Sequence, residues 1–428
     1  MAGPNRRGKL RVGLVVQRYG TEVIGGAETH CRMLAEHLNA RPEVECVTVF
    51  TTCAKSHATW DNEYASGSSS INGVPVQRFP AEHKRCALLQ HALGCLVRPP
   101  VRASLLDRSW LRAQGPYVPR LVDELDQVHT QYDVFVFFTY LYFPTAVAMP
   151  RLAHKALLIP TAHDEPQLGI KVFSELFSLP KGLAYNTEEE RALVETRFDV
   201  SAKPAIVLGC GVDAIDPPPQ ADSLATGPYL IYVGRIARGK GCHDLFRLFA
   251  RFKQEHAQDS FVSPSFGAFR GKELRLIVVG QGSLKLPNRP DIVQAVQPVD
   301  DRRKSALLRD AELLVLPSRF ESLSLVVLEA WSLGVAVLVN GRCPVLDGQV
   351  RRSGGGRSYR SDTEFGEHLA QMLGEPEERR GMGRLGRRYV DQRYRWDVVE
   401  DRLLDFMIGL YTPLSGFLRN KTAPRKPP

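Results

Sequence analysis

Glu321 and Glu329 lie eight positions apart in a segment that leads from an apolar run into a predicted helix. Residues 313–317 have the composition of a buried strand, and Ser322 and Ser324 are typical helix starters. Eight positions span about 12 Å along a helix axis. One carboxylate therefore precedes the helix, and the other lies two turns inside it. The free N–H groups of the first turn lie between them and can bind a diphosphate, while the carboxylates can accept hydroxyl donors from a sugar and a ribose.

A basic loop forms a second candidate site. Residues 234–241 read Gly-Arg-Ile-Ala-Arg-Gly-Lys-Gly and follow the apolar run 229–233. Arg235 offers a planar fork and Lys240 a point charge, and two fixed cations of this kind can neutralise a departing diphosphate without a metal. The alternative is a solvated basic loop, which the spacing of Gly234, Arg235 and Lys240 makes the less favoured interpretation.

Glycine-rich turns follow two other predicted strands. Gly25 and Gly26 open a predicted helix after the first strand, and Gly280 and Gly282 follow the apolar run 274–279. Glycine allows the backbone to approach a phosphate closely. A plain turn explains either pair almost as well, and the chain has no Gly-x-Gly-x-x-Gly pattern that would indicate dinucleotide binding.

His163 follows a predicted strand at 156–161, at the end where ligands bind in parallel sheets. An imidazole there can donate to a sugar hydroxyl or to a transferring oxygen. The alternative is a structural histidine held by Asp164.

Short apolar strands alternate with amphipathic helices along all 428 residues, which predicts doubly wound α/β domains. Asn72-Gly73 predicts a hairpin, and Thr187 with Glu190 has the spacing of a capping box. We expect an acceptor-side Rossmann-like domain at 10–212, a Pro-rich linker at 213–227 and a second such domain at 228–395. A helix at 396–411 is expected to cross back to the first domain, and the ends 1–9 and 412–428 to be disordered.

Composition limits the class of protein. The hydrophobic share is 43% and the net charge +9, which suits a globular protein with anionic partners. No apolar run is long enough for a membrane helix, and the eight cysteines form no Cys-x-x-Cys pair. These features favour a cytoplasmic protein with reduced thiols, with peripheral association at the inner membrane face as a further option.

Taken in chain order, Gly-Gly-Ala-Glu at 25–28, His163-Asp164, the Arg235/Lys240 loop, Val-Gly-Gln-Gly at 279–282 and the glutamate pair resemble the retaining family 4 glycosyltransferases. The resemblance covers about residues 10–411. It departs from the family pattern at 322–324, where Ser-Leu-Ser replaces Gly-Phe-Gly, and at Ala336, which replaces a proline.

This resemblance implies the GT-B fold, in which two Rossmann-like domains face a central cleft. It implies hexosyl transfer from a nucleotide-diphosphate sugar by front-face displacement, with no metal and no cofactor. The transferred sugar would contact Glu321, the ribose Glu329, and the sugar or acceptor His163. The diphosphate would contact Arg235 and Lys240, with the donor also bound by Gly25, Gly26, Gly234, Gly280, Gly282, Ser324, Leu325 and Val326.

The acceptor is expected to be a glycan, a lipid-linked glycan or a small molecule bound to the first domain. Residues 83–112 mix leucines with Lys84, Arg85, Arg98, Arg102, Arg108 and Arg112, which suits either an anionic membrane surface or a helical flap with solvated cations. Two rival functions are a nucleotide-sugar epimerase on the same fold and a non-enzymatic anion- or nucleic-acid-binding module. Nucleic acid is not expected as a partner, because no recognition motif accompanies the positive charge.

Overall fold

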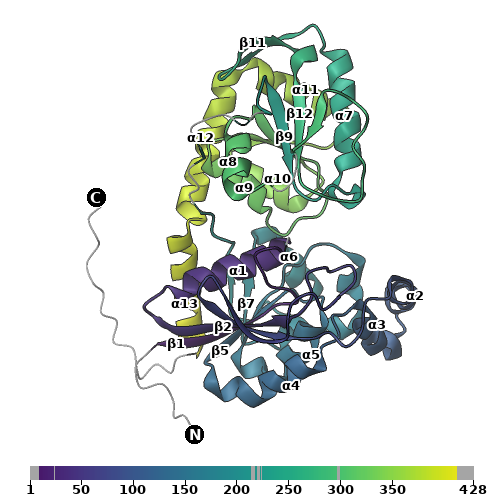
Figure 1. The fold of residues 1–428 in the computed structure, drawn as a ribbon, viewed down its shortest axis with the longest axis vertical. Helices are drawn as coiled ribbons and strands as arrows, with labels where there is room; N and C mark the ends of the chain where they lie inside the picture. Colours follow the sequence, from purple (N-terminus) through teal and green to yellow (C-terminus); the bar gives the residue numbers. More distant parts are fainter. Residues whose placement is uncertain are drawn as a thin grey trace.

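The chain folds into two α/β lobes, and its last helix returns from the second lobe to the first (Figure 1). This computed structural model describes residues 9–23, 25–213, 217–218, 222, 224–295 and 299–411. The predicted disordered ends therefore lie outside the described residues, apart from Lys9, as does part of the predicted linker at 213–227.

The N-terminal lobe contains an eight-stranded sheet in the order β3-β4-β2-β1-β5-β6-β7-β8. All neighbouring strands are parallel except β3 and β4, which form the hairpin predicted at Asn72-Gly73. Its strands are β1 Leu10–Val15, β2 Val44–Thr52, β3 Gly67–Ile71, β4 Val74–Phe79, β5 Val134–Phe138, β6 Ala156–Ile159, β7 Gly182–Tyr185 and β8 Ala205–Val207. Its main helices are α1 Gly26–Asn39, α2 Ala87–Val97, α3 Asp107–Gln114, α4 Pro119–Val128, α5 Phe143–Arg151 and α6 Glu188–Arg197.

The C-terminal lobe contains a six-stranded parallel sheet in the order β13-β12-β9-β14-β15-β16. Its strands are β9 Tyr229–Val233, β12 Arg275–Val279, β13 Ile292–Gln294, β14 Leu313–Leu316, β15 Val337–Asn340 and β16 Gly356–Tyr359, and β10 Ser260–Ser263 with β11 Gly267–Arg270 forms a separate hairpin. The helices are α7 Cys242–Glu255, α8 Asp301–Arg309, α9 Leu325–Ser332, α10 Pro344–Ser353, α11 Asp362–Gly374, α12 Pro376–Arg393 and α13 Trp396–Tyr411. Two Rossmann-like α/β domains are therefore present, as predicted.

Strand order sets the position of the functional loops. In each sheet the chain starts in the middle, at β1 or β9, and adds neighbours on both sides. The strand order reverses at those central strands, and ligands of open α/β sheets bind at the carboxyl ends of such strands. The Gly25 loop follows β1, and the Arg235 loop follows β9.

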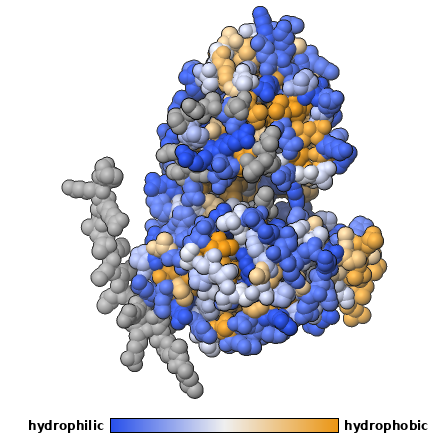
Figure 2. Space-filling model, viewed as in Figure 1, coloured by the Kyte–Doolittle hydropathy of each residue, from blue (hydrophilic) through white to orange (hydrophobic). Residues whose placement is uncertain are grey.

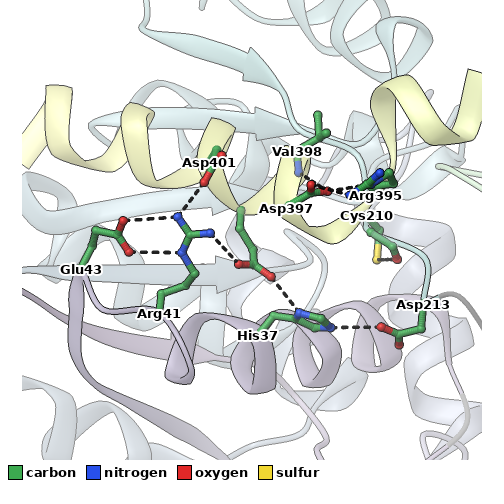
Figure 3. Close-up of polar contacts among 11 residues, drawn as sticks. His37, Arg41, Glu43, Cys210, Asp213, Arg395, Asp397, Val398 and Asp401 are labelled. Atoms are coloured by element: carbon green, nitrogen blue, oxygen red, sulfur yellow. Dashed lines mark hydrogen bonds and ion pairs between the residues drawn. The ribbon is translucent and has the colours of Figure 1, made fainter. Parts of the chain in front are cut away.

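The last helix, α13, leaves the C-terminal lobe and packs on the N-terminal lobe (Figure 1). Arg402 donates to the carbonyl of Leu208 at 2.7 Å, and the Tyr411 hydroxyl donates to the carbonyl of Ala156 at 2.7 Å. His37 of α1 lies between Asp213 and Glu400, and Arg41 contacts Glu400 and Asp401 (Figure 3). Polar contacts thus fix α13 and the start of the connection to α1.

No helix among the described residues combines the length and the apolar composition that a membrane crossing requires.

Candidate active site between the two lobes

Helix α9 carries the glutamate pair at the carboxyl end of β14. The helix begins at Leu325, and Glu321 precedes it while Glu329 lies within it. Ser324 does not cap the helix as predicted: it has φ +69° and its side chain makes no cap hydrogen bond. Its carbonyl instead accepts from the N–H of Val327 at 3.2 Å. A left-handed serine is strained, and such strain is typical of functional loops.

Lys240 and Glu321 meet across neighbouring strands. Lys240 ends a turn after β9, Glu321 follows β14, and the Lys240 Nζ lies 2.7 Å from Glu321 Oε1. The side chains are 29% and 14% exposed, so the pair is accessible from the cleft and yet partly shielded from water. The cation and carboxylate that the sequence separates by 81 positions are therefore neighbours in one site.

Glu329 has a partner that sequence reasoning missed. Lys304 of α8 lies 3.0 Å from Glu329 and 2.9 Å from Asp301. Burial acts to lower the pKa of Lys304, but the two carboxylates outweigh it and raise the pKa. Lys304 is thus charged and fixes the Glu329 carboxylate. The basic run at 302–304 was a possible signal, but only the packing of α8 on α9 identifies the pair.

Three of the predicted donor-binding glycines are required by the crossing of two loops. A Cβ atom at Gly280 would lie 1.9 Å from the Gly234 carbonyl, and one at Gly282 would lie 1.9 Å from the Ile236 carbonyl. Gly234 and Gly280 also have φ of +152° and +144°. The loops after β9 and β12 are further joined by the hydrogen bond from the Ile236 N–H to the Gln281 carbonyl, at 2.9 Å. Backbone contact within the protein accounts for Gly280 and Gly282, and the positive φ accounts for Gly234.

Arg235 reaches the opposite lobe. Its guanidinium lies 3.4 Å from Nε2 of His57, in the loop after β2. Burial lowers the pKa of His57, and the neighbouring Arg18 and Arg235 lower it further. A neutral imidazole can accept from the guanidinium, which fits the contact between His57 and Arg235. No motif in the sequence indicates His57, because the contact joins residues 178 positions apart.

The two glycines at the start of α1 differ in the space around them. A Cβ atom at Gly25 would lie 2.2 Å from the Glu28 carboxylate, whereas one at Gly26 would meet no atom within 4 Å. Glu28 is buried and accepts from Gln17 at 2.8 Å and from Arg18 at 2.6 Å. Gly25 therefore makes room for an internal cluster, and the space beside Gly26 at the helix N-terminus is free of protein atoms in that direction.

His163 and Glu321 line one pocket of about 240 Å³ between the lobes, together with Phe320, Arg319 and Arg342. The His163 ring lies 6.0 Å from the Phe320 ring, centroid to centroid, and its Nε2 lies 3.5 Å from Glu165. Glu165 is the carboxylate beside the imidazole, and not Asp164 as in the alternative of a structural histidine; Glu165 also accepts from the Tyr140 hydroxyl at 2.7 Å.

Glu190 of α6 holds the loop that carries His163. Its carboxylate accepts from the N–H of Ala162 at 2.5 Å and from that of Asn186 at 2.6 Å. Half of the predicted capping box is present, because the Glu190 N–H donates to Thr187 Oγ1 at 3.1 Å, but the Glu190 carboxylate accepts from Ala162 and Asn186 and not from the Thr187 N–H. Burial raises the pKa of Glu190 to about 8, although the two backbone donors act in the opposite direction.

The site thus has two clusters on the C-terminal side, Lys240 with Glu321 and Lys304 with Glu329, and a facing wall that contributes His57 and His163. Cations, a helix N-terminus and carboxylates at the ends of central parallel strands can bind an anionic ligand that also carries hydroxyl groups.

Comparison with known proteins identifies the fold. Residues 218–389 match the family model described as glycosyl transferases group 1. A sucrose-phosphate synthase from Thermosynechococcus elongatus is similar in structure, with a TM-score of 0.67, 17% identity, and coverage of 94% of this chain and 99% of that one. HepE from Anabaena, in complex with UDP and glucose, has a TM-score of 0.62 at 14% identity and covers 94% of this chain and 100% of its own. WaaG, a glycosyltransferase of lipopolysaccharide biosynthesis, has a TM-score of 0.61 at 14% identity, with the same coverage. The search of curated proteins finds no match. The fold is GT-B.

Proposed function

We propose that this chain is a retaining glycosyltransferase that moves a hexosyl unit from a nucleotide-diphosphate sugar to a glycan, a lipid-linked glycan or a small molecule. The observation that carries the proposal is the 2.7 Å contact of Lys240 with Glu321 beside the start of α9. Lys240, which can bind a diphosphate, is thus next to Glu321, whose carboxylate can accept from a sugar hydroxyl. The match of residues 218–389 to the group 1 family supports the same class of reaction.

Donor binding in this proposal divides among the clusters. The diphosphate contacts Arg235, Lys240 and the N–H groups of Leu325 and Val326, which have no partner inside the helix because they belong to its first turn. Glu329, oriented by Lys304, accepts from the ribose hydroxyls. The sugar lies toward Glu321 and the pocket that His163 lines from the other lobe. Gly26 offers open space for phosphate at the start of α1.

The transfer breaks the bond from the anomeric carbon to the diphosphate oxygen. The acceptor oxygen forms its new bond on the same face, and its proton passes to the departing phosphate oxygen. Negative charge grows on the leaving group, and Arg235 and Lys240 are positioned to stabilise it without waiting for solvent to reorganise. His163 positions the sugar or the acceptor hydroxyl. In this scheme the fixed cations provide the neutralisation, so a divalent metal is not required.

The test begins with thermal unfolding in the presence of nucleoside diphosphates and nucleotide sugars, since a ligand selective for the native state raises the melting temperature. UDP and UDP-glucose come first, because HepE was solved with UDP and glucose. Candidate acceptors are then added, and release of the nucleoside diphosphate and the anomeric configuration of the product are followed by NMR.

Acceptor-dependent release with retained configuration supports the proposal. Conversion of the donor to an epimer without any acceptor would assign the site to an epimerase instead. Salt-sensitive oligonucleotide binding, with no stabilisation by any nucleotide sugar, would assign the chain to nucleic-acid binding.

A further inference from the structure

A small helical subdomain, called the helical lobe here to distinguish it from the two α/β lobes, projects from the N-terminal domain after β4 (Figure 1). It consists of α2, a short 3-10 turn at Ser104–Leu106 and α3. Its inner side is firmly attached: Val97, Trp110 and Leu111 are buried, and the Asp107 carboxylate accepts from the Val172 N–H at 2.8 Å. The lobe is therefore a fixed part of the domain, and its outer face is a permanent feature of the surface.

The outer face is apolar (Figure 2). Of the nine exposed large apolar side chains among the described residues, five lie here: Leu88, Leu89, Leu96, Val101 and Leu105. Leu88 is 84% exposed and Leu105 is 97% exposed. Single exposed leucines are ordinary, but a cluster on one projecting element indicates an interaction surface.

The same lobe carries positive charge with almost no negative charge. Residues 87–112 contain four arginines and a single acidic residue, Asp107, which is buried. Arg102 and Arg108 are exposed, close in sequence to Val101 and Leu105. Apolar side chains bordered by arginines complement an interface in which anionic headgroups lie above hydrocarbon.

We propose that residues 87–112 dock this protein on an anionic lipid bilayer, with Leu88 and Leu105 entering the interface and Arg102 and Arg108 contacting headgroups. The base of the helical lobe adjoins the candidate site. Arg85 donates to the His57 carbonyl at 2.9 Å, and the His57 ring contacts Arg235. Docking thus brings the mouth of the cleft near the lipid surface, and it does so whether or not the proposed reaction is correct.

The experiment measures flotation of the full chain with vesicles of phosphatidylcholine alone and of phosphatidylcholine mixed with phosphatidylglycerol. We compare the wild type with Leu88→Ser/Leu105→Ser and with Arg102→Glu/Arg108→Glu. The matched controls lie on α12 of the other domain: Leu385→Ser for the exposed leucines, and Arg387→Glu/Arg388→Glu for the exposed arginines. Thermal unfolding confirms that each variant is folded.

We expect binding that needs the anionic lipid and weakens with salt. The arginine pair should weaken it about tenfold or more, since each basic group near such a surface contributes substantially. The leucine pair should weaken it at both low and high salt, and the α12 controls should leave it unchanged.

A fluorescent probe locates the contact. Of the eight cysteines, Cys86 and Cys95 are exposed; Cys95 lies within the segment, and Cys86 immediately precedes it. With Cys86→Ser, a polarity-sensitive dye on Cys95 should shift to the blue when anionic vesicles are added. Absent flotation, equal binding by all variants, or an unchanged dye would overturn the proposal. Light scattering that shows a dimer, lost on Leu88→Ser/Leu105→Ser while vesicles have no effect, would replace the bilayer with a second copy of the chain.

Discussion

Lys240 and Arg235 both contact groups of the protein itself, Glu321 at 2.7 Å and His57 at 3.4 Å. A diphosphate that enters the cleft must compete with these contacts. For Arg235 the competitor is a neutral imidazole and costs little to displace. For Lys240 the competitor is a carboxylate, so the ammonium must be shared between Glu321 and the ligand.

Lys240→Ala should lower the rate of transfer by at least about a hundredfold, because loss of one fixed charge at a developing anion has effects of this size. Arg235→Ala should do the same. Turnover of the donor is the measurement, with the melting temperature as the check on folding. Lys272→Ala is the control, since Lys272 is exposed beyond the amino end of β12. Near-normal rates in both Lys240→Ala and Arg235→Ala would refute their assignment.

Glu321→Gln should change binding and turnover in opposite directions. Neutralising the carboxylate frees Lys240 and removes a repulsive charge, so the Kd of a nucleoside diphosphate should fall several-fold, as about 1 kcal/mol of charge interaction would give. Transfer should nevertheless be lost, because Glu321 contacts the sugar in the proposed complex. Calorimetry gives the Kd and product formation gives the rate. Weaker diphosphate binding would show that Glu321 does not compete for Lys240.

The loop after β9 carries Arg235, and it is supported where it crosses the loop after β12. Gly280→Ala should lower the free energy of unfolding by about 2 kcal/mol, because the new Cβ would meet the Gly234 carbonyl at a separation of 1.9 Å. Denaturant unfolding measures the loss. Gly374→Ala is the matched control: its Cβ meets nothing within 4 Å at the end of α11, so it should be neutral or slightly stabilising. Equal effects of the two substitutions would mean that the crossing is not tight.

Periodicity and turn chemistry predicted the elements well. The strand Tyr229–Val233 has the predicted bounds, and Asn72-Gly73 forms its hairpin with φ of +49° and +81°. Element ends were predicted less accurately: the strand predicted at 156–161 is Ala156–Ile159. Ser324 was assigned as a cap from its residue type, but it adopts a left-handed conformation that the loop after β14 imposes.

The site was predictable where its residues follow strands and not where they meet through packing. Glu321, Lys240 and Arg235 could be proposed as members of one candidate site because ligands of parallel sheets bind at the carboxyl ends of central strands, and the structure brings Lys240 and Glu321 into contact. His57, Lys304 and Glu165 act through neighbours that are distant in sequence or on another helix. Gly280 and Gly282 show that a sequence pattern can also suggest too much. Their pattern is typical of phosphate loops, but contact between two backbones explains it here.

His37 makes the attachment of α13 depend on pH. Partial burial acts to lower its pKa, but hydrogen bonds and charge interactions with Asp213 and Glu400 raise it above the ordinary value (Figure 3). A histidine whose folded pKa is raised stabilises the fold fully below the unfolded pKa of about 6.5, and this stabilisation is lost as the pH rises through the folded value. The stability lost on His37→Gln should therefore be larger at pH 6 than at pH 8. Urea unfolding of both proteins at the two pH values measures it, and an equal loss at both would contradict the linkage.

The two lobes also touch on the other side of the cleft. Arg352 of α10 donates to both carboxylate oxygens of Glu189 on α6, at 2.5 and 2.9 Å. The side chains are 27% and 16% exposed, so the pair is shielded more than a surface ion pair. Gly348 lies against the same carboxylate, and a Cβ there would come within 1.8 Å of Glu189 Oε1. Since Glu189 and Arg342 both line the His163 pocket, the contact borders the candidate site.

We expect the Arg352–Glu189 contact to hold the two lobes in the arrangement that the structure has. In a double-mutant cycle with Glu189→Gln and Arg352→Gln, the coupling energy should be about 1 kcal/mol, near the upper range for partly exposed pairs. Gly348→Ala should displace the Glu189 carboxylate and so weaken the ion pair with Arg352 without removing a charge. Small-angle scattering of the free protein should give a larger radius of gyration for each single variant. Arg357→Gln is the control, because Arg357 pairs with Glu378 inside the C-terminal lobe. If the cycle gives no coupling and the radius is unchanged, this ion pair does not hold the lobes together, and the other contacts between them, such as Arg235 with His57 and the attachment of α13 to α1, must do so.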